Sequence, residues 1–325
     1  MSRRWLAFSR FFLGTAVVFA AHFSASGFAS PSQPFLYSNL IYRPLFLLFL
    51  LLGFGTVVSG FDRAPGNPLA AIGLAMRRPW LRDLWIGGLL GSGMVAVAVA
   101  AIAFAGGFAI TVSTASQATA RAVLVVVILA AGAMAEEISF RGYPFQQLVR
   151  AVGSAPAVVI LSLLFGVVHL ANPDASAWGF LNTVLIGVLL ALAYLRTRSL
   201  WMPIAIHFWW NITLGLVFGL PVSGLRGFSV VVHGRAMGPL WLTGGDYGLE
   251  ASAVCAGVIV AGMAMLLVFV PSRKTVLVLG ANESPELPVA ASASENRLTL
   301  PSPEENTSRL ALPPTSSDGE DFSNL

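Results

Sequence analysis

Charged residues are scarce in this chain of 325 amino acids, of which only 10% are Asp, Glu, Lys or Arg. Soluble domains carry roughly 25%, so the chain has too little charge to cover a water-soluble globule of this length. Hydrophobic residues make up 56%, and the mean hydropathy is +0.78. This balance excludes a soluble enzyme, and the 32 Gly and 19 Pro without a fixed period exclude a collagen-like chain. The composition predicts an integral membrane protein.

Cysteine is almost absent, since Cys255 is the single one in the sequence. It lies in the apolar run 251–270 and has no partner, so an intrachain disulfide is excluded and no redox compartment is indicated. We expect Cys255 to be a small buried apolar side chain.

Acidic residues are few in most of the chain but not at its end. Residues 1–274 hold 17 basic and 7 acidic side chains, whereas residues 275–325 hold 2 basic and 8 acidic ones. The end segment is rich in Ser, Pro, Glu and Asn, and such a composition buries too little apolar surface to offset the entropy of ordering. It is predicted to be a disordered tail. No basic run is long enough for nucleic acid, so no nucleic-acid partner is predicted.

Apolar segments recur along the chain at the length of about 20 residues that a membrane helix needs. No alternating pattern typical of a membrane barrel is present. The prediction is an all-α polytopic membrane protein with about eight transmembrane helices. The segments are 9–28, 44–61, 84–106, 119–137, 154–171, 178–195, 201–220 and 250–270.

Basic residues predict the orientation of these helices. If the N-terminus is cytoplasmic, thirteen basic residues fall on the cytoplasmic side and four outside, as the positive-inside rule expects. The four outside are Arg43, Arg121, Arg226 and Arg235. Both termini are then cytoplasmic. A cleaved signal peptide is the alternative for the first segment, and it would leave seven helices in the same orientation.

Two adjacent carboxylates, Glu136 and Glu137, lie in the fourth apolar segment, where charge is costly and usually functional. Glu137 and Arg141 are four residues apart and can pair on one helix face. Glu136 points about 100° away on a helix with 3.6 residues per turn, so it is free to act as a base. The alternative is an ordinary charge cluster at a helix end.

Two histidines lie in other apolar segments. His169 ends the fifth segment, and His207 shares a helix face with Asn211 in the seventh. Each has a structural alternative, as a hydrogen-bonded residue at a helix end or as a polar contact between helices. Together with a glutamate they could hold and polarise one water molecule, with or without a metal. Zinc would accept His169, His207 and a carboxylate as ligands, although the zincin motif H-E-x-x-H is absent.

Two features complicate this interpretation. The order of the segments places His169 near the opposite membrane face from Glu136, which strains a common site. Other polar residues are given structural or solvated roles, and Asp246 and Glu250 are assigned to a solvated position in or beside the outside loop at about 221–249. His22 and His233 are treated in the same way.

The three polar clusters occur as E-E-x-x-F-R-G at 136–142, F-x-x-x-H at 165–169 and H-x-x-x-N at 207–211. In this order they resemble the motifs of the CPBP family of intramembrane proteases, which is related to the CAAX prenyl endopeptidases and also called the Abi family. The resemblance covers about residues 120–275. It suggests three regions, with N-terminal helices at 1–118, a protease core at 119–274 and the cytoplasmic tail at 275–325.

The resemblance implies a role for each motif residue. Glu136 would be the general base, Glu137 and Arg141 would position the site, and His169 would hold the water or a metal. His207 and Asn211 would form the oxyanion hole or complete the ligand set. If zinc is used, its ligands would be Glu136, His169 and His207, and a metal-free glutamate mechanism is equally open.

The predicted function is therefore that of an intramembrane endopeptidase in the plasma membrane of a bacterial-type cell. Its partners would be membrane lipid and a membrane-associated protein or peptide substrate, which could be CAAX-prenylated or another bacterial peptide. The alternative is a non-catalytic transporter, or a peptide-binding or immunity protein that uses the same polar cavity. No internal symmetry of the kind common in transporters is visible.

Overall fold

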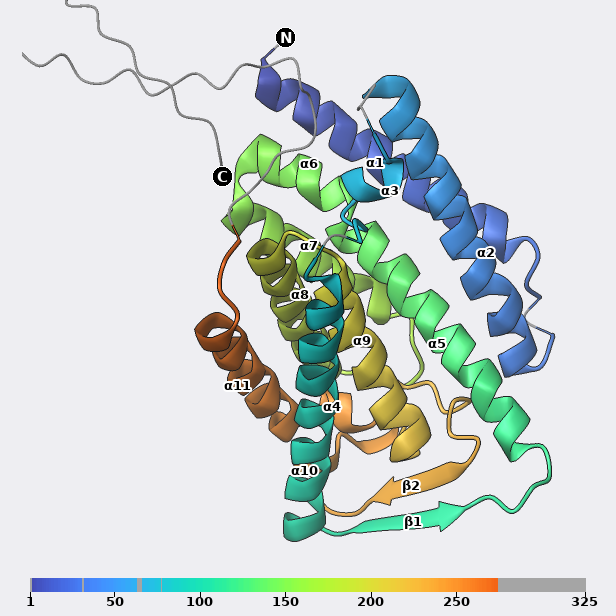
Figure 1. Ribbon diagram of the computed structural model, residues 1–325. Helices are drawn as coiled ribbons and strands as arrows, with labels where there is room; N and C mark the ends of the chain where they lie inside the picture. Colours follow the sequence, from blue (N-terminus) through green and yellow to red (C-terminus); the bar gives the residue numbers. More distant parts are fainter. Residues whose placement is uncertain (1, 31, 63–65, 77, 274–325) are drawn as a thin grey trace, which may run out of the picture. The chain divides into compact units, whose positions relative to one another are not determined.

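The computed structural model describes residues 2–30, 32–62, 66–76 and 78–273. This part of the chain is mostly helical (Figure 1), which confirms the predicted helical class. The tail predicted over 275–325 lies outside the described residues.

A helix occupies each of the eight predicted apolar segments. In chain order they are α1 (Arg3–Ser26), α2 (Phe35–Thr56), α4 (Trp80–Ala105), α5 (Ala118–Arg141), α7 (Ser154–His169), α8 (Ala177–Thr197), α9 (Trp201–Ile212) and α11 (Ala253–Phe269). The π-helical turns η1 (Val57–Phe61) and η2 (Thr213–Val217) extend α2 and α9. Among the described residues, five helices are long and apolar enough to span a membrane, namely α1, α2 with η1, α4, α5 with α6, and α8. They make this an integral membrane protein.

The prediction of an all-α chain is wrong in one detail. Strand β1 (Phe108–Val112) pairs antiparallel with β2 (Val232–Ala236), with Phe108 opposite Ala236. The β-branched residues of β1 favour an extended backbone, but their partner lies more than 100 residues later in the chain. Three short elements, α10 (Leu240–Thr243), η3 (Gly245–Tyr247) and η4 (Leu249–Ala251), follow β2, and α3 (Pro68–Ala71) precedes α4.

The helix α6 (Tyr143–Val152) connects α5 to α7 and does not follow from the pattern of apolar segments. Gly142 follows α5 at a position where a Cβ would overlap the carbonyl of Ile138, and Pro144 lies in the first turn of α6. Gly153 has a φ of 91°, which permits the turn into α7. Figure 1 shows α6 at one end of α5, so α5 and α7 are not joined by a simple hairpin.

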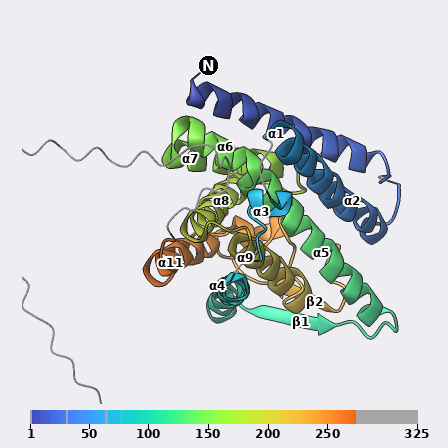
Figure 2. The same cartoon turned by 45° about the horizontal axis from the view of Figure 1, so that its top comes forward.

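Small residues bring α4 and α9 together. A Cβ on Gly87 or Gly91 would overlap the α9 backbone at Met202 or Ile206, so the two helices touch along a small-xxx-small stripe. Helix α9 also packs against α5, and Figure 2 shows it between α4 and α5. The position of His207 on α9 therefore depends on glycines of α4.

The arginines assigned to outside loops lie in different places. Arg43 is inside α2 and Arg121 is in the first turn of α5, so the loop assignment of these two is wrong. Arg226 lies between η2 and β2, and Arg235 is in β2. Charge counting fails for Arg43 because it treats residues before an apolar core as loop, whereas α2 begins at Phe35. The orientation in the membrane stays a prediction.

Candidate active site

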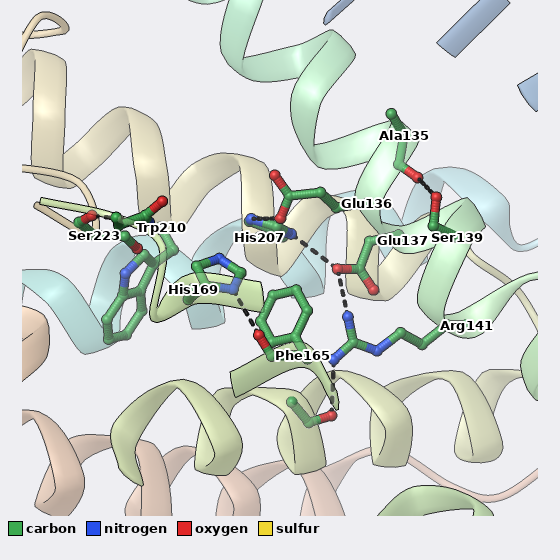
Figure 3. A network of polar contacts seen from close by, with 12 residues as sticks. Ala135, Glu136, Glu137, Ser139, Arg141, Phe165, His169, His207, Trp210 and Ser223 are labelled. Carbon is green, nitrogen blue, oxygen red and sulfur yellow. Dashed lines mark hydrogen bonds and ion pairs between the residues drawn. The ribbon is translucent and has the colours of Figure 1, made fainter. Parts of the chain in front are cut away.

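Glu137 is the centre of a buried polar cluster that joins three helices (Figure 3). Its side chain is fully buried, and its Oε1 accepts hydrogen bonds from Arg141 on the same helix (3.1 Å) and from Nδ1 of His207 on α9 (2.9 Å). Arg141 also donates to the carbonyl oxygen of Gly187 on α8 (3.0 Å). The predicted pair of Glu137 and Arg141 therefore forms, and it ties α5 to α8 and α9.

Aromatic rings surround the buried guanidinium. Arg141 lies 4.5 Å from the centroid of the Phe165 ring and 5.7 Å from that of Phe140. A desolvated cation gains from such contacts with ring faces. The rings also exclude water, which strengthens the ion pair with Glu137.

His207 has its two ring nitrogens in different environments. Because Glu137 accepts the Nδ1–H, the Nε2 atom is directed to the other carboxylate, where it lies 3.7 Å from Oε2 of Glu136. This Oε2 atom is buried and has no hydrogen-bond partner within the described part of the chain. The two glutamates thus have separate environments, as the 100° separation on the helix predicts.

His169 lies in the same region although it ends α7. Its Nδ1 donates to the carbonyl oxygen of Phe165 (2.7 Å), which leaves Nε2 for other contacts. The Phe165 ring lies 4.5 Å from the His169 ring and 6.2 Å from the His207 ring. The Phe165 ring therefore lies between the two imidazole rings and contacts both, and Figure 3 shows His169 beside it.

Glu136, His169, His207 and Asn211 line one cavity of about 820 Å³. Its volume is within the range of small-molecule and peptide sites. The expected conflict between Glu136 and His169 therefore does not exist. The physical reason is that α7 has only 16 residues and is preceded by α6, so the segment before His169 is not one long uninterrupted span.

The zinc ligand set can be tested against this geometry. Among the residues that the structure describes, no group of three or more His, Cys, Asp or Glu side chains is placed to hold a metal ion. Glu136, His169 and His207 share a cavity wall but are thus not assembled as a set of ligands. Cys255 is buried, as expected, and does not join them.

Glu250 also lines the cavity, and its assignment to a solvated loop is wrong. The residue is buried in η4, where its carboxylate accepts hydrogen bonds from Nε1 of Trp210 (3.0 Å) and from the backbone N–H and hydroxyl of Ser223. Asn182 of α8 donates to its backbone oxygen. Burial raises the pKa of the Glu250 carboxyl, although the hydrogen bonds oppose this rise.

The other residues for which a structural or solvated role is predicted are Asp246, His22 and His233. Asp246 is exposed and pairs with Arg226 (2.7 Å), which confirms its solvated assignment. His22 bonds to Tyr42 at the cavity wall, and His233 is exposed in β2. No local signal distinguishes Glu250 from Asp246, because the burial of Glu250 comes from α8 and α9.

Replacing Glu250 by Leu is expected to destabilise the protein. The change leaves the buried donors of Trp210 and Ser223 without an acceptor, at roughly 1–3 kcal/mol for each. Thermal unfolding in detergent micelles should show a lower midpoint for Glu250→Leu than for Glu250→Gln, which keeps one acceptor oxygen. Asp246→Asn is the exposed control, and a Glu250→Leu midpoint equal to that of the control would contradict the expectation.

Comparisons with known proteins concern the part of the chain that holds most of the site. A search of curated proteins finds no match to the chain. Residues 117–213 match the model of a family described as type II CAAX prenyl endopeptidase Rce1-like. The matched region contains Glu136, Glu137, Arg141, His169, His207 and Asn211. Over residues 117–213, the chain is therefore similar to the Rce1-like family of type II CAAX prenyl endopeptidases.

Proposed function

We propose that this protein is an intramembrane endopeptidase that hydrolyses a peptide bond of a membrane-associated protein or peptide. One observation carries the proposal. Arg141, Glu137 and His207 form a buried chain of hydrogen bonds that directs Nε2 of His207 to Glu136. Glu136 lies in the wall of a large cavity, and its Oε2 has no hydrogen-bond partner among the described residues.

The residues have complementary roles in the proposed reaction. Glu137 holds the Nδ1–H of His207 and so selects its tautomer, as a carboxylate orients the histidine of a catalytic triad. Arg141 forms a buried ion pair with Glu137 and so holds that carboxylate in place. Glu136 is then the carboxylate that is free to accept a proton.

The proposed hydrolysis begins with a water molecule between Glu136 and the substrate carbonyl. Glu136 takes one proton while the water oxygen bonds to the carbonyl carbon, which forms a tetrahedral oxyanion. Asn211, which lies one turn from His207 on α9, is placed to donate its amide N–H to the negative oxygen, and His207 donates to it from Nε2 only in the doubly protonated form. Glu136 then gives its proton to the leaving nitrogen, and the C–N bond breaks.

The setting of the site in the membrane completes the proposal. We propose eight spans, of which α7, α9 with η2 and α11 are short, with both termini cytoplasmic in the plasma membrane of a bacterial-type cell. The substrate would be a prenylated protein of the CAAX class or another membrane-associated peptide.

The test uses the full chain in liposomes with N-terminally palmitoylated nonapeptides, randomised at their last four positions, and mass spectrometry of the products. Wild-type protein should cut a subset of the peptides. The assay is repeated with a chelator and after metal analysis of the same sample. About one zinc per chain with chelator-sensitive cleavage supports a metallopeptidase, and full activity without metal supports the glutamate mechanism.

Two results would oppose this function. Uptake of peptide into the liposomes without any cut product would identify a transporter. Binding of intact peptide without uptake or cleavage would identify a peptide-binding protein. Asp246→Asn serves as the control variant, since Asp246 is exposed and outside the cavity.

A further inference from the structure

A second cavity lies between α4 and α11, outside the proposed active site. Its volume is about 400 Å³, and every described residue that lines it is apolar or glycine. Figures 1 and 2 both show α11 beside α4. We call this cavity the α4–α11 groove, and it follows α4 from Ile86 to Val97 and α11 from Val258 to Phe269. Among the described residues, only Met94 lines both the groove and the active-site cavity. The two cavities are therefore separate sites that share one wall.

The groove has the length of one lipid chain. Ile86 and Val97 are eleven positions apart on α4, which is about 16 Å along the helix axis at 1.5 Å per residue. The hydrocarbon core of a bilayer is about 30 Å thick, so the chains of one leaflet reach about 15 Å into it. Gly93 leaves the middle of the groove open, because a Cβ at this position would meet no atom within 4 Å. One acyl chain of one leaflet therefore fits along the groove.

The groove has a charged residue at one end only. Arg82 precedes Ile86 by four residues, so it shares the face of α4 that lines the groove. Its side chain is exposed and forms no ion pair or hydrogen bond with the described residues. The adjacent Asp83 pairs instead with Arg273, which follows α11. After Asp83 neither α4 nor α11 contains a charged residue. The groove is thus basic at one end and apolar along its length, which matches an anionic amphiphile.

Tryptophans indicate that Arg82 lies at the membrane surface. Trp80 and Trp85 flank it in the first turns of α4, and Trp85 is 74% exposed. Trp80 packs on Trp201 at the start of α9, with 5.4 Å between the ring centroids. Tryptophan side chains are enriched at the level of the lipid headgroups. Arg82 is therefore at the depth of a lipid phosphate, and the groove is at the depth of the acyl chains.

We propose that the α4–α11 groove binds one acyl chain of an anionic phospholipid, whose headgroup phosphate binds Arg82. A guanidinium can donate two parallel N–H bonds to phosphate oxygens. In the predicted orientation this end of α4 is cytoplasmic, where anionic lipids attract basic residues. Lipid tails are as apolar as the groove, so the acyl chain sets the position of the lipid and the headgroup sets the selectivity.

A second copy of this chain fits the groove less well than a lipid does. It would have to bring a carboxylate to Arg82. The carboxylates that the described residues offer on this side of the membrane are Asp62 and Asp83, and both are already paired, with Arg10 and Arg273. A phospholipid supplies the negative charge and the apolar chain in one molecule.

The experiment places the full chain in phosphatidylcholine vesicles with a trace of a photoactivatable lipid. The probe is phosphatidylglycerol or phosphatidylcholine with a diazirine in the middle of one acyl chain, and mass spectrometry locates the labelled residues after irradiation. The phosphatidylglycerol probe should label Val97 and Met265, which line only the groove, about 5-fold more than the phosphatidylcholine probe does. Labelling of the other lipid-facing helices should be equal for the two probes.

Two variants test the two halves of the site. Arg82→Gln should bring the ratio of the two probes in the groove close to one, whereas Arg4→Gln, at an exposed position of α1, should keep the wild-type ratio. Gly93→Leu should lower labelling of the groove by either probe at least about 5-fold, because the new side chain occupies the space of the acyl chain. Gly55→Leu is its control on α2, since a Cβ there also meets no atom within 4 Å. The unfolding midpoint should show that each variant is folded.

Three results would overturn the proposal. Equal labelling of the groove by both probes, or a preference that Arg82→Gln leaves unchanged, would indicate ordinary surrounding lipid. An unlabelled groove in a protein that cross-links to a second copy would indicate a dimer interface. Loss of groove labelling when the palmitoylated peptide binds Glu136→Gln protein would indicate a site for the lipid anchor of the substrate. None of these measurements needs peptide cleavage, so the lipid site and the proposed function succeed or fail separately.

Discussion

Glu136→Gln is expected to abolish peptide cleavage while the protein still folds. A general base contributes about 10²- to 10⁴-fold to a rate, and an amide cannot accept the proton of water. The fold should not depend on this carboxylate, because its side chain is 28% exposed and its Oε2 makes no hydrogen bond within the described residues. The expected result is a loss of at least about 100-fold in kcat with an unchanged unfolding midpoint.

The measurement is single-turnover cleavage of a peptide that the wild-type protein cuts in the liposome assay, with thermal unfolding of the same preparations. Asp246→Asn is the matched control, because it removes one carboxylate from an exposed loop and should change neither quantity. Wild-type cleavage by folded Glu136→Gln would remove Glu136 from the mechanism. The base would then have to be sought among the other groups at the cavity wall, with Glu250 as the first candidate.

The helices of this protein could be predicted because each follows from a local property of the chain. Apolar runs near the length of a membrane span indicate all eight main helices, although the starts of α1 and α2 lie six and nine residues before the predicted ones. The pairing of Glu137 with Arg141 is equally local, because residues four apart face each other on any α-helix. The meeting of α5 with α9 is not local, and only the resemblance in three motifs indicates it.

The features that could not be predicted depend on contacts between distant segments. Glu250 and Asp246 are four residues apart in a glycine-rich stretch, yet Trp210 and Ser223 bury only Glu250. The register of β1 with β2 likewise depends on a strand far along the chain. Arg43 resembles a loop residue in the sequence because apolar character becomes continuous only after it, while α2 begins a full two turns earlier.

Breaking the buried ion pair should have the largest effect on stability. Arg141→Met leaves the carboxylate of Glu137 buried beside His207 alone, and Glu137→Leu leaves the guanidinium with only the carbonyl of Gly187 and two aromatic rings. Loss of one partner from a buried pair costs about 3–5 kcal/mol. Each single variant should therefore unfold at a markedly lower temperature, or fail to accumulate in the membrane.

The double variant Glu137→Leu with Arg141→Met should recover most of the lost stability, because no isolated charge is left inside the protein. It should still be inactive, because His207 has lost the carboxylate that holds its Nδ1–H and directs Nε2 to Glu136. A folded but inactive double variant separates the cost of burying the pair from its use in catalysis. If the losses of the single variants simply add, the two charges do not stabilise each other. If the double variant cleaves peptide at the wild-type rate, orientation of His207 by Glu137 is not required.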